Sequence, residues 1–316
     1  MRIFRHYRDV PDASKGAVVA VGNFDGVHLG HQALIGEARR LARERGVPLG
    51  VVAFEPHPQE FFHPSTQSFR LTPFRVKARL IAELKADILY AIAFDAEMAA
   101  KSARDFVQDV LVQGLGVDTI VVGEDFQFAK GRSGNVALLQ TMGKESKFGV
   151  SVFKSVAAGG YDKISSTQIR DALKQGQPDV AARLLGHYWS VEARVEHGDK
   201  RGRSIGFPTA NMKLVDCLQP AFGIYAARAK VLEDDNVVSE HEGVSSFGIR
   251  PMFEVDTPLL ETYLFDFDGD LYGKHLAVEL VAYLRPEMRL ESLDALKVQI
   301  AADSDAARNA LRSASS

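Results

Sequence analysis

Two histidines near the N-terminus stand in a pattern typical of phosphate binding. The stretch 21–32 has the sequence VGNFDGVHLGHQ, so His28 and His31 are three residues apart and face the same side of a helical turn. A β-branched run precedes them and a helical pattern follows. At such a helix start, free N–H groups and the helix dipole favour anions. A metal pair or two solvated loop histidines are the alternatives for His-x-x-His alone, but the complete His-Leu-Gly-His after a glycine-rich turn favours phosphate.

A second polar motif lies in GDKRGRSIGFPTANMKL, residues 198–214. Gly202 and Gly206 lie in a loop with three basic residues, and a flexible basic loop of this kind suits covering phosphates. Thr209 and Asn211 are alternate residues, so their side chains share one face of an extended segment. A hydroxyl and an amide on one face can hold Mg²⁺ or bind phosphates. For the tetrapeptide PTAN alone, a solvent-exposed turn is the alternative.

The first motif resembles the His-Xaa-Gly-His motif with which nucleotidylyltransferases bind the phosphates of ATP. With FEPHP (54–58), VGEDFQFAKGRSGN (122–135) and ISSTQIRDAL (164–173), it resembles the FMN adenylyltransferase module of bacterial bifunctional riboflavin kinase/FAD synthetases. The resemblance implies in-line attack of the FMN phosphate on the α-phosphorus of ATP. It assigns ATP binding or catalysis to Gly22, Asn23, Asp25, His28, Gly30, His31, Ser165, Ser166 and Arg170. It assigns flavin contacts to His57 and Asp125, although a structural turn histidine is an alternative for His57. Ala129 stands where the family often has glycine.

The second motif resembles the riboflavin kinase signature Gly-Xaa-Pro-Thr-Ala-Asn, and the likeness extends over 220–231, 243–253, 260–273 and 284–303. It implies that Glu261 is the catalytic base, which takes the proton of the ribityl hydroxyl as that oxygen attacks the γ-phosphorus. It assigns ATP to Gly202, Gly206, Thr209 and Asn211, Mg²⁺ to Thr209 and Asn211, and flavin to Arg289, for which a solvated rim charge is the alternative. Ser245, Ser246 and Met252 occupy places where the family more often has Ala, Asn and Thr.

The elements that must position the first motif alternate between strands and helices. Apolar runs at 16–24, 48–54, 88–94, 118–123 and 150–156 predict strands, and the pattern at 31–46 predicts a helix that ends at Gly46. Thr72 is expected to cap the next helix, and Ser102 with Asp105 to form a capping box. This alternation predicts an α/β doubly wound parallel sheet, with ligands at the carboxyl ends of its strands.

From about residue 187 the pattern changes to short stretches of alternating apolar and polar residues, separated by Gly and Pro. This favours a small antiparallel β-barrel, followed by a C-terminal helix after Glu291. We therefore expect two domains. Residues 1–185 would form the nucleotidylyltransferase domain and residues 186–316 the riboflavin kinase-like domain, with Trp189 packed at the junction.

Composition limits the class of protein. The chain has 316 residues, 46% of them hydrophobic, a net charge of −3 and one cysteine, Cys217, which excludes an internal disulfide. The sequence shows no signal peptide, no apolar run of membrane-spanning length and no basic excess of the kind typical of nucleic-acid binding. We expect a cytoplasmic bifunctional transferase that uses riboflavin, FMN and ATP with Mg²⁺, without nucleic-acid or membrane partners. A chain with one active module and a non-catalytic flavin- or nucleotide-binding regulator are the alternatives.

Overall fold

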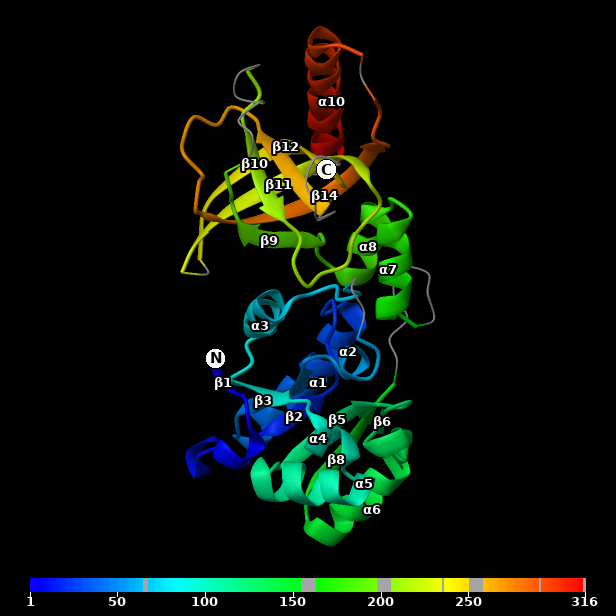
Figure 1. Ribbon diagram of the computed structural model, residues 1–316. Coiled ribbons are helices and arrows are strands. Elements are labelled where there is room, and N and C mark those ends of the chain that lie inside the picture. The colour runs from blue at the N-terminus through cyan, green and yellow to red at the C-terminus, as the bar shows by residue number, and fades with distance from the viewer. Residues whose placement is uncertain are drawn as a thin grey trace. The chain divides into compact units, whose positions relative to one another are not determined.

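The computed structural model describes residues 1–64, 68–154, 163–197, 206–234, 236–249, 258–289 and 291–314. The chain divides into two compact units (Figure 1). Unit 1 comprises Met1–Thr66 and Thr72–Ser165, and unit 2 comprises Gln67–Leu71 and Ser166–Ser316. Unit 1 thus ends about twenty residues before the boundary expected near residue 186, since the two intervening helices pack with unit 2.

Unit 1 is built on a six-stranded parallel sheet in the order β1-β4-β3-β2-β5-β8, as the alternation of strands and helices predicts. Its strands are β1 (Arg2–Phe4), β2 (Val18–Val21), β3 (Leu49–Glu55), β4 (Ile88–Ala93), β5 (Thr119–Gly123) and β8 (Gly149–Phe153). Helices α1 (Leu29–Arg45) and α3 (Phe74–Glu83) pack on one face, and η3 (Phe106–Gly114) and α6 (Val136–Ser146) on the other. The doubly wound prediction is therefore confirmed.

Local signals explain where most of these elements begin and end. Helix α1 ends at Gly46, whose φ of 66° is left-handed, as expected. Ser102 accepts a hydrogen bond from the Asp105 N–H, so the predicted cap is also present. The expectation for Thr72 is wrong, because α3 begins at Phe74 after Pro73 and has no side-chain cap. Nor did the sequence predict that η3 would be a π-helix.

The remaining short elements of unit 1 connect this framework. They are η1 (Tyr7–Asp9), η2 (Asp12–Ser14), α2 (Pro58–Phe62), α4 (Ala96–Ala100), α5 (Ala103–Asp105), β6 (Gln127–Phe128), η4 (Lys130–Arg132) and β7 (Gly134–Asn135).

Unit 2 contains a six-stranded antiparallel sheet in the order β10-β13-β12-β11-β14-β9. Its strands are β9 (Ser190–Arg194), β10 (Thr209–Lys213), β11 (Gly223–Glu233), β12 (Asn236–Ile249), β13 (Pro258–Leu264) and β14 (His275–Arg285). A bridge between Glu196 and Asn211 links the two ends of this order, so the sheet curls towards the predicted barrel. Helix α10 (Leu293–Ser313) packs Ala307 and Leu311 against it, while α7 (Ser166–Lys174) and α8 (Pro178–Leu185) complete the unit.

A short early segment of the chain also belongs to unit 2. The carbonyl oxygen of Leu71 accepts a 2.7 Å hydrogen bond from the indole N–H of Trp189, which is buried as expected. The carbonyl oxygen of Arg70 accepts from the Leu218 N–H at 2.7 Å. Residues 68–71 are therefore held through their backbone carbonyl groups within a unit whose remainder lies almost a hundred residues further along the chain.

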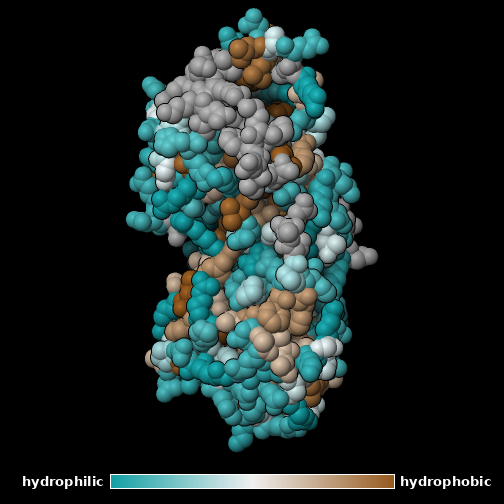
Figure 2. Space-filling view, viewed as in Figure 1, coloured by the Kyte–Doolittle hydropathy of each residue, from teal (hydrophilic) through white to brown (hydrophobic). Residues whose placement is uncertain are grey.

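Hydrophilic side chains predominate on the face shown in Figure 2. Within the described ranges, no helix is both long and apolar enough to cross a membrane.

Candidate functional sites

The two motif histidines form one compact group at the carboxyl end of β2. His28 is the N-cap of α1, and its Nδ1 accepts a 3.3 Å hydrogen bond from the His31 N–H. The two imidazoles stack with centroids 3.5 Å apart and an interplanar angle of 16°. A methyl group in place of the Gly30 hydrogen would lie 3.2 Å from the His28 ring, so this glycine allows the close approach. The predicted shared orientation of the histidines is confirmed, although α1 begins two residues earlier than expected.

The charge state of the pair follows from its surroundings. Because Nδ1 of His28 accepts a hydrogen bond, the proton of the neutral ring is on Nε2. Burial, with help from neighbouring His28 and Lys77, holds the pKa of His31 well below its ordinary value. The Nδ1 of His31 is buried and has no hydrogen-bond partner. His31 is therefore neutral near pH 7, while Nδ1 of His28 serves as the hydrogen-bond acceptor at the start of α1.

Asp25 has a structural partner that the sequence did not suggest. Its carboxylate is buried and accepts hydrogen bonds from the N–H and hydroxyl of Thr72, at 3.1 and 3.3 Å. The Thr72 hydroxyl in turn accepts a 3.0 Å bond from the Gly26 N–H. Gly22 lies beside the ring of Phe24, and Asn23 is exposed. These contacts hold the loop that precedes His28 in place. Contacts of Gly22, Asn23 and Asp25 with ATP stay predictions.

A buried ion pair lies at the same edge of the sheet and was missed in the sequence. The ammonium of Lys77, on α3, is 2.7 Å from Oε1 of Glu55, the last residue of β3. The Lys77 side chain is only 2% exposed and that of Glu55 10%. A lysine in the apolar stripe of α3, four residues before buried Ile81, is the signal that could have revealed it.

The other motif residues of unit 1 lie on loops. His57 is buried and its Nδ1 accepts a hydrogen bond from the Gln59 N–H at 3.1 Å, which gives it a capping role at α2. Asp125 is exposed and ion-pairs with Lys163, which lowers the pKa of the carboxyl group. Ala129 has φ 63° and ψ −174°, a conformation that strongly favours glycine. Flavin contacts by His57 and Asp125 stay predictions.

The ISSTQIRDAL motif is divided between the compact units. Ser165 ends unit 1, whereas Ser166 and Arg170 belong to α7 of unit 2. The guanidinium of Arg170 donates from Nε to the carbonyl oxygen of Phe69 at 2.8 Å and lies over the ring of that residue. Phosphate binding by Ser165, Ser166 and Arg170 stays a prediction.

In unit 2, strand pairing brings together the polar residues of the second motif. Glu261 on β13 pairs with Asn211 on β10 and with Ser246 on β12. Residues directly opposite each other in an antiparallel sheet point to the same face, so these three side chains form one row across the sheet. Thr209 is two residues from Asn211 on the same strand and therefore lies on that face.

The row offers an oxygen ligand of the kind that Mg²⁺ prefers. The side-chain Oδ1 of Asn211 is buried and has no hydrogen-bond partner, although its amide nitrogen donates to the Thr209 carbonyl at 3.2 Å. Mg²⁺ takes hard oxygen ligands and usually keeps several waters beside one or two protein groups and substrate phosphates. Thr209 and Asn211 fit this sparse arrangement. Among the described residues, no group of three or more His, Cys, Asp or Glu side chains is arranged to hold a metal ion.

Glu287 lies near the row and was also missed. A methyl group on Gly248 would come within 2.1 Å of a Glu287 carboxylate oxygen, so that carboxylate rests on the β12 backbone two residues from Ser246. Burial and the nearby charge of Glu261 raise the pKa of Glu287. The unit thus places two carboxylates within electrostatic reach of each other. The stretch LRPEMRL, which contains both Glu287 and Arg289, is the sequence signal for this carboxylate.

For several other predicted residues, the described part of the chain shows no contact that bears on a role in binding. Arg289 is exposed, so its flavin contact stays a prediction. Gly206 has a left-handed φ of 91°, which suits the turn into β10. Gly202 and Met252 lie outside the described residues. Ser245, one of the departures, is buried and its hydroxyl lies 2.8 Å from that of Thr262.

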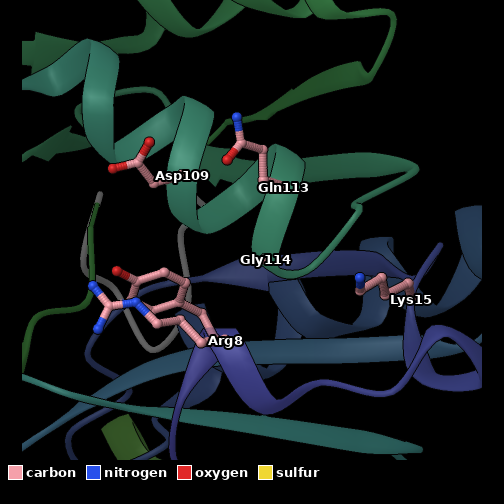
Figure 3. Close-up of a pocket in the computed structure, with 6 residues that line it drawn as sticks. Arg8, Lys15, Asp109, Gln113 and Gly114 are labelled. Carbon is pink, nitrogen blue, oxygen red and sulfur yellow. The ribbon is translucent and has the colours of Figure 1, made fainter.

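A cavity of about 310 Å³ in unit 1 lies apart from both motifs (Figure 3). It is lined by Tyr7, Arg8, Lys15, Asp109, Gln113 and Gly114. Lys15 precedes β2 and Gly114 precedes β5, so the cavity lies towards the amino ends of the strands, away from the histidine pair. Its charged groups are engaged in ion pairs: Arg8 with Glu97, Lys15 with Asp12 and Asp109 with Lys101.

Comparison with known proteins agrees with this two-part organisation. Residues 10–168 match the family model for FAD synthetase, and residues 185–311 match that for riboflavin kinase. The bifunctional riboflavin kinase/FMN adenylyltransferase of Escherichia coli K12 is 40% identical over 309 residues, which cover 98% of this chain and 97% of that protein. The chain belongs to this family. The Haemophilus influenzae protein of the same name is 36% identical over 98% of each chain.

A solved structure supports the same fold for the full length. A protein from Streptococcus pneumoniae described as a macrolide-efflux protein superposes with a TM-score of 0.85 and 28% identity, covering 97% of this chain and 98% of that one. As a member of the riboflavin kinase/FMN adenylyltransferase family, the present chain shares both domain types in the family order.

Proposed function

We propose that this chain makes FMN and FAD at two separate sites. Unit 2 phosphorylates riboflavin to FMN with ATP, and unit 1 adenylates FMN to FAD with release of pyrophosphate. The observation that supports this best is the row that strand pairing forms from Asn211, Glu261 and Ser246, because it gives a base and an oxygen ligand on one face. Because both reactions consume ATP, we place the enzyme in the cytoplasm.

In the kinase reaction, Glu261 acts as the base. It accepts the proton of the ribityl hydroxyl while that oxygen bonds to the γ-phosphorus of ATP and the bond from the γ-phosphorus to the ADP oxygen breaks. Thr209 and Asn211 would hold Mg²⁺, which neutralises charge on the phosphates when it is bound. Burial and the nearby charge of Glu261 favour the protonated form of the Glu287 carboxyl group, because both raise its pKa.

In the adenylyltransferase reaction, the protein supplies position and hydrogen bonds and needs no nucleophile of its own. An oxygen of the FMN phosphate attacks the α-phosphorus of ATP as the bond to the bridging oxygen breaks and pyrophosphate leaves. His28 donates from Nε2, because its Nδ1 is occupied by the helix cap. The positive end of the α1 dipole lies beside the rings and adds to the positive potential.

Two substitutions test this division of labour. Glu261→Gln removes the base, so FMN formation from riboflavin falls at least a hundredfold while adenylation of supplied FMN continues. His31→Ala has the opposite effect. Flavins are separated by chromatography after incubation with ATP and Mg²⁺. Glu240→Gln and His6→Ala, at two exposed positions, are the matched controls and keep both activities.

The outcomes separate the alternatives. Loss of both reactions in either folded variant contradicts two independent sites. A wild-type protein that forms FMN without FAD, or FAD from FMN without FMN from riboflavin, has one working site. Flavin binding without any turnover identifies a non-catalytic binder.

A further inference from the structure

The buried Lys77–Glu55 pair has no role in the mechanism above, yet it lies at the edge of the sheet that carries the histidines. β2 and β3 are parallel neighbours in which Val21 pairs with Val52, and Glu55 ends β3 three residues further on. The carboxyl ends of both strands therefore meet at one edge. Burying a full ammonium group is costly, and a single carboxylate partner does not explain why it is placed at this edge.

Lys77 and His31 have equivalent places on two helices that pack on the same face of the sheet. In α1, Leu34 and Ile35 face the apolar core, and His31 lies three and four residues before them on the same stripe. In α3, Ile81 faces the same core, and Lys77 lies one turn before it. His31 and Lys77 therefore both lie in the first turn of their helix, on the side that faces one shared apolar cluster.

Three features of the histidine pair require it to be uncharged. Its rings are stacked 3.5 Å apart, a distance at which two imidazolium ions repel strongly. The Nδ1 of His28 accepts the His31 N–H and cannot do so when protonated. A proton on Nδ1 of His31 would be a buried donor with no acceptor, because that atom has no partner here. Protonation of either ring would therefore disturb the stack or the start of α1.

We propose that Lys77 is a positioning residue of the adenylyl-transfer site, whose buried ammonium, held by Glu55, keeps the stacked His28–His31 pair uncharged until the phosphates of ATP arrive. Among the described residues, the charged or titratable groups that act on His31 are His28, on the loop before α1, and Lys77, on α3, with Glu55 of β3 behind Lys77. Burial is the largest cause of the low pKa of His31, and the charges of His28 and Lys77 lower it further, which agrees with this assignment. The inference rests on the proposed function of unit 1.

The direct test follows the imidazole signals of the full-length protein by NMR between pH 7.5 and 5.5. The His31 signal is assigned by its absence in His31→Ala. In the wild type, His31 does not titrate in this range. In Lys77→Met its midpoint rises towards the ordinary histidine value of about 6.5. Lys77→Arg keeps the charge and keeps His31 neutral.

Loss of Lys77 alone leaves the Glu55 carboxylate buried, so Lys77→Met is paired with the double variant Lys77→Met/Glu55→Gln, in which neither charge remains. Far-UV circular dichroism confirms that each variant is folded. Exposed Lys144 on α6, replaced by Met, is the matched control for loss of a lysine from unit 1. Its His31 signal matches that of the wild type.

A kinetic readout connects the pair to the reaction. With FMN supplied, kcat/KM for ATP in Lys77→Met falls between pH 7.5 and 5.5, by at most about tenfold, which is the fall in the neutral fraction of a histidine with the ordinary pKa of about 6.5. Because His31 stays buried in this variant, its midpoint lies below that value and the fall is smaller. The wild type and Lys77→Arg show no such inflection, and riboflavin phosphorylation keeps its wild-type pH profile in every variant.

A His31 signal that fails to titrate in both folded Lys77→Met variants overturns the proposal. So does a His31 that titrates while kcat/KM depends on pH no more steeply than in the wild type. A wild-type protein that forms FMN but no FAD disproves the function proposed for unit 1. The NMR midpoint of His31 then still decides whether Lys77 controls the charge of the pair.

Discussion

The hydroxyl of Thr72 ties the histidine loop to the rest of unit 1, and Thr72→Val removes it with little change of volume. Thr72 is 2% exposed. Its hydroxyl accepts from the Gly26 N–H at 3.0 Å and donates to the Asp25 carboxylate at 3.3 Å. Removing a buried acceptor costs about 1–3 kcal/mol, and a hydrogen bond to a carboxylate contributes about 1.5–3 kcal/mol. Because Asp25 keeps its bond to the Thr72 N–H, we expect a net loss of about 3 kcal/mol.

That loss lowers the ratio of folded to unfolded unit 1 by a factor of about 150. It is measured as the shift of the urea unfolding transition followed by far-UV circular dichroism, together with faster amide exchange at Gly26. The looser loop also lowers kcat/KM for ATP in FAD formation severalfold, while riboflavin phosphorylation in unit 2 keeps its wild-type rate.

Two matched variants make the result interpretable. Thr72→Ser keeps the hydroxyl and stays within about 1 kcal/mol of the wild type, since it loses one buried methyl group. Thr141→Val removes an exposed hydroxyl that donates only to a carbonyl of its own helix, α6, and changes stability by less than about 0.5 kcal/mol. Equal unfolding midpoints for Thr72→Val and Thr141→Val would refute the argument that the Thr72 hydroxyl holds the loop.

Three further changes have definite expected outcomes. Ala129→Gly relieves a positive φ of 63° and stabilises unit 1 by about 1 kcal/mol, seen as a higher urea midpoint; an unchanged midpoint contradicts strain at this residue. Glu287 has a raised pKa when folded, so wild-type stability falls as pH rises from about 4.5 through that pKa. In Glu287→Gln the stability does not fall in this way, as measured by thermal unfolding at several pH values with the fluorescence of Trp189. A loss of stability of the same size in the variant contradicts the assignment to Glu287. Asp303→Ala leaves Arg285 without the carboxylate that it contacts at 2.8 and 2.6 Å, costs about 3 kcal/mol and makes α10 the first segment cut in limited proteolysis. If α10 is cut no faster than in the wild type, this ion pair does not anchor the helix.

Most of the framework of unit 1 could be predicted because its signals are local. Val18–Val21 is apolar throughout because both faces of a parallel strand are buried, and this run is visible in the sequence. The shared orientation of His28 and His31 follows from helical spacing alone. Such features depend on a few consecutive residues and need no knowledge of the rest of the chain.

Features that depend on distant partners could not be predicted. Threonine is a common helix cap, but the Thr72 hydroxyl instead accepts a hydrogen bond from the Gly26 N–H and donates one to the Asp25 carboxylate. Both partners precede Thr72 by more than forty residues. The pairing of Asn211 with Glu261 depends on strand register, which no local pattern specifies across fifty residues. The apolar stripe of α3 marks Lys77 as buried, but its partner Glu55 is identified only when α3 lies against β3.

The placement of residues 68–71 in unit 2 has a consequence for the order in which the chain folds during synthesis. These residues leave the ribosome long before Trp189 and Leu218, whose N–H groups donate to the carbonyls of Leu71 and Arg70. All residues of unit 1 are therefore synthesised before the hydrogen-bond donors of this segment, Trp189 and Leu218, leave the ribosome. A C-terminal fragment synthesised separately lacks these carbonyl acceptors, so the N–H groups of Trp189 and Leu218 lose the partners that residues 68–71 supply within unit 2. The complete hydrogen bonding of unit 2 therefore requires one continuous polypeptide.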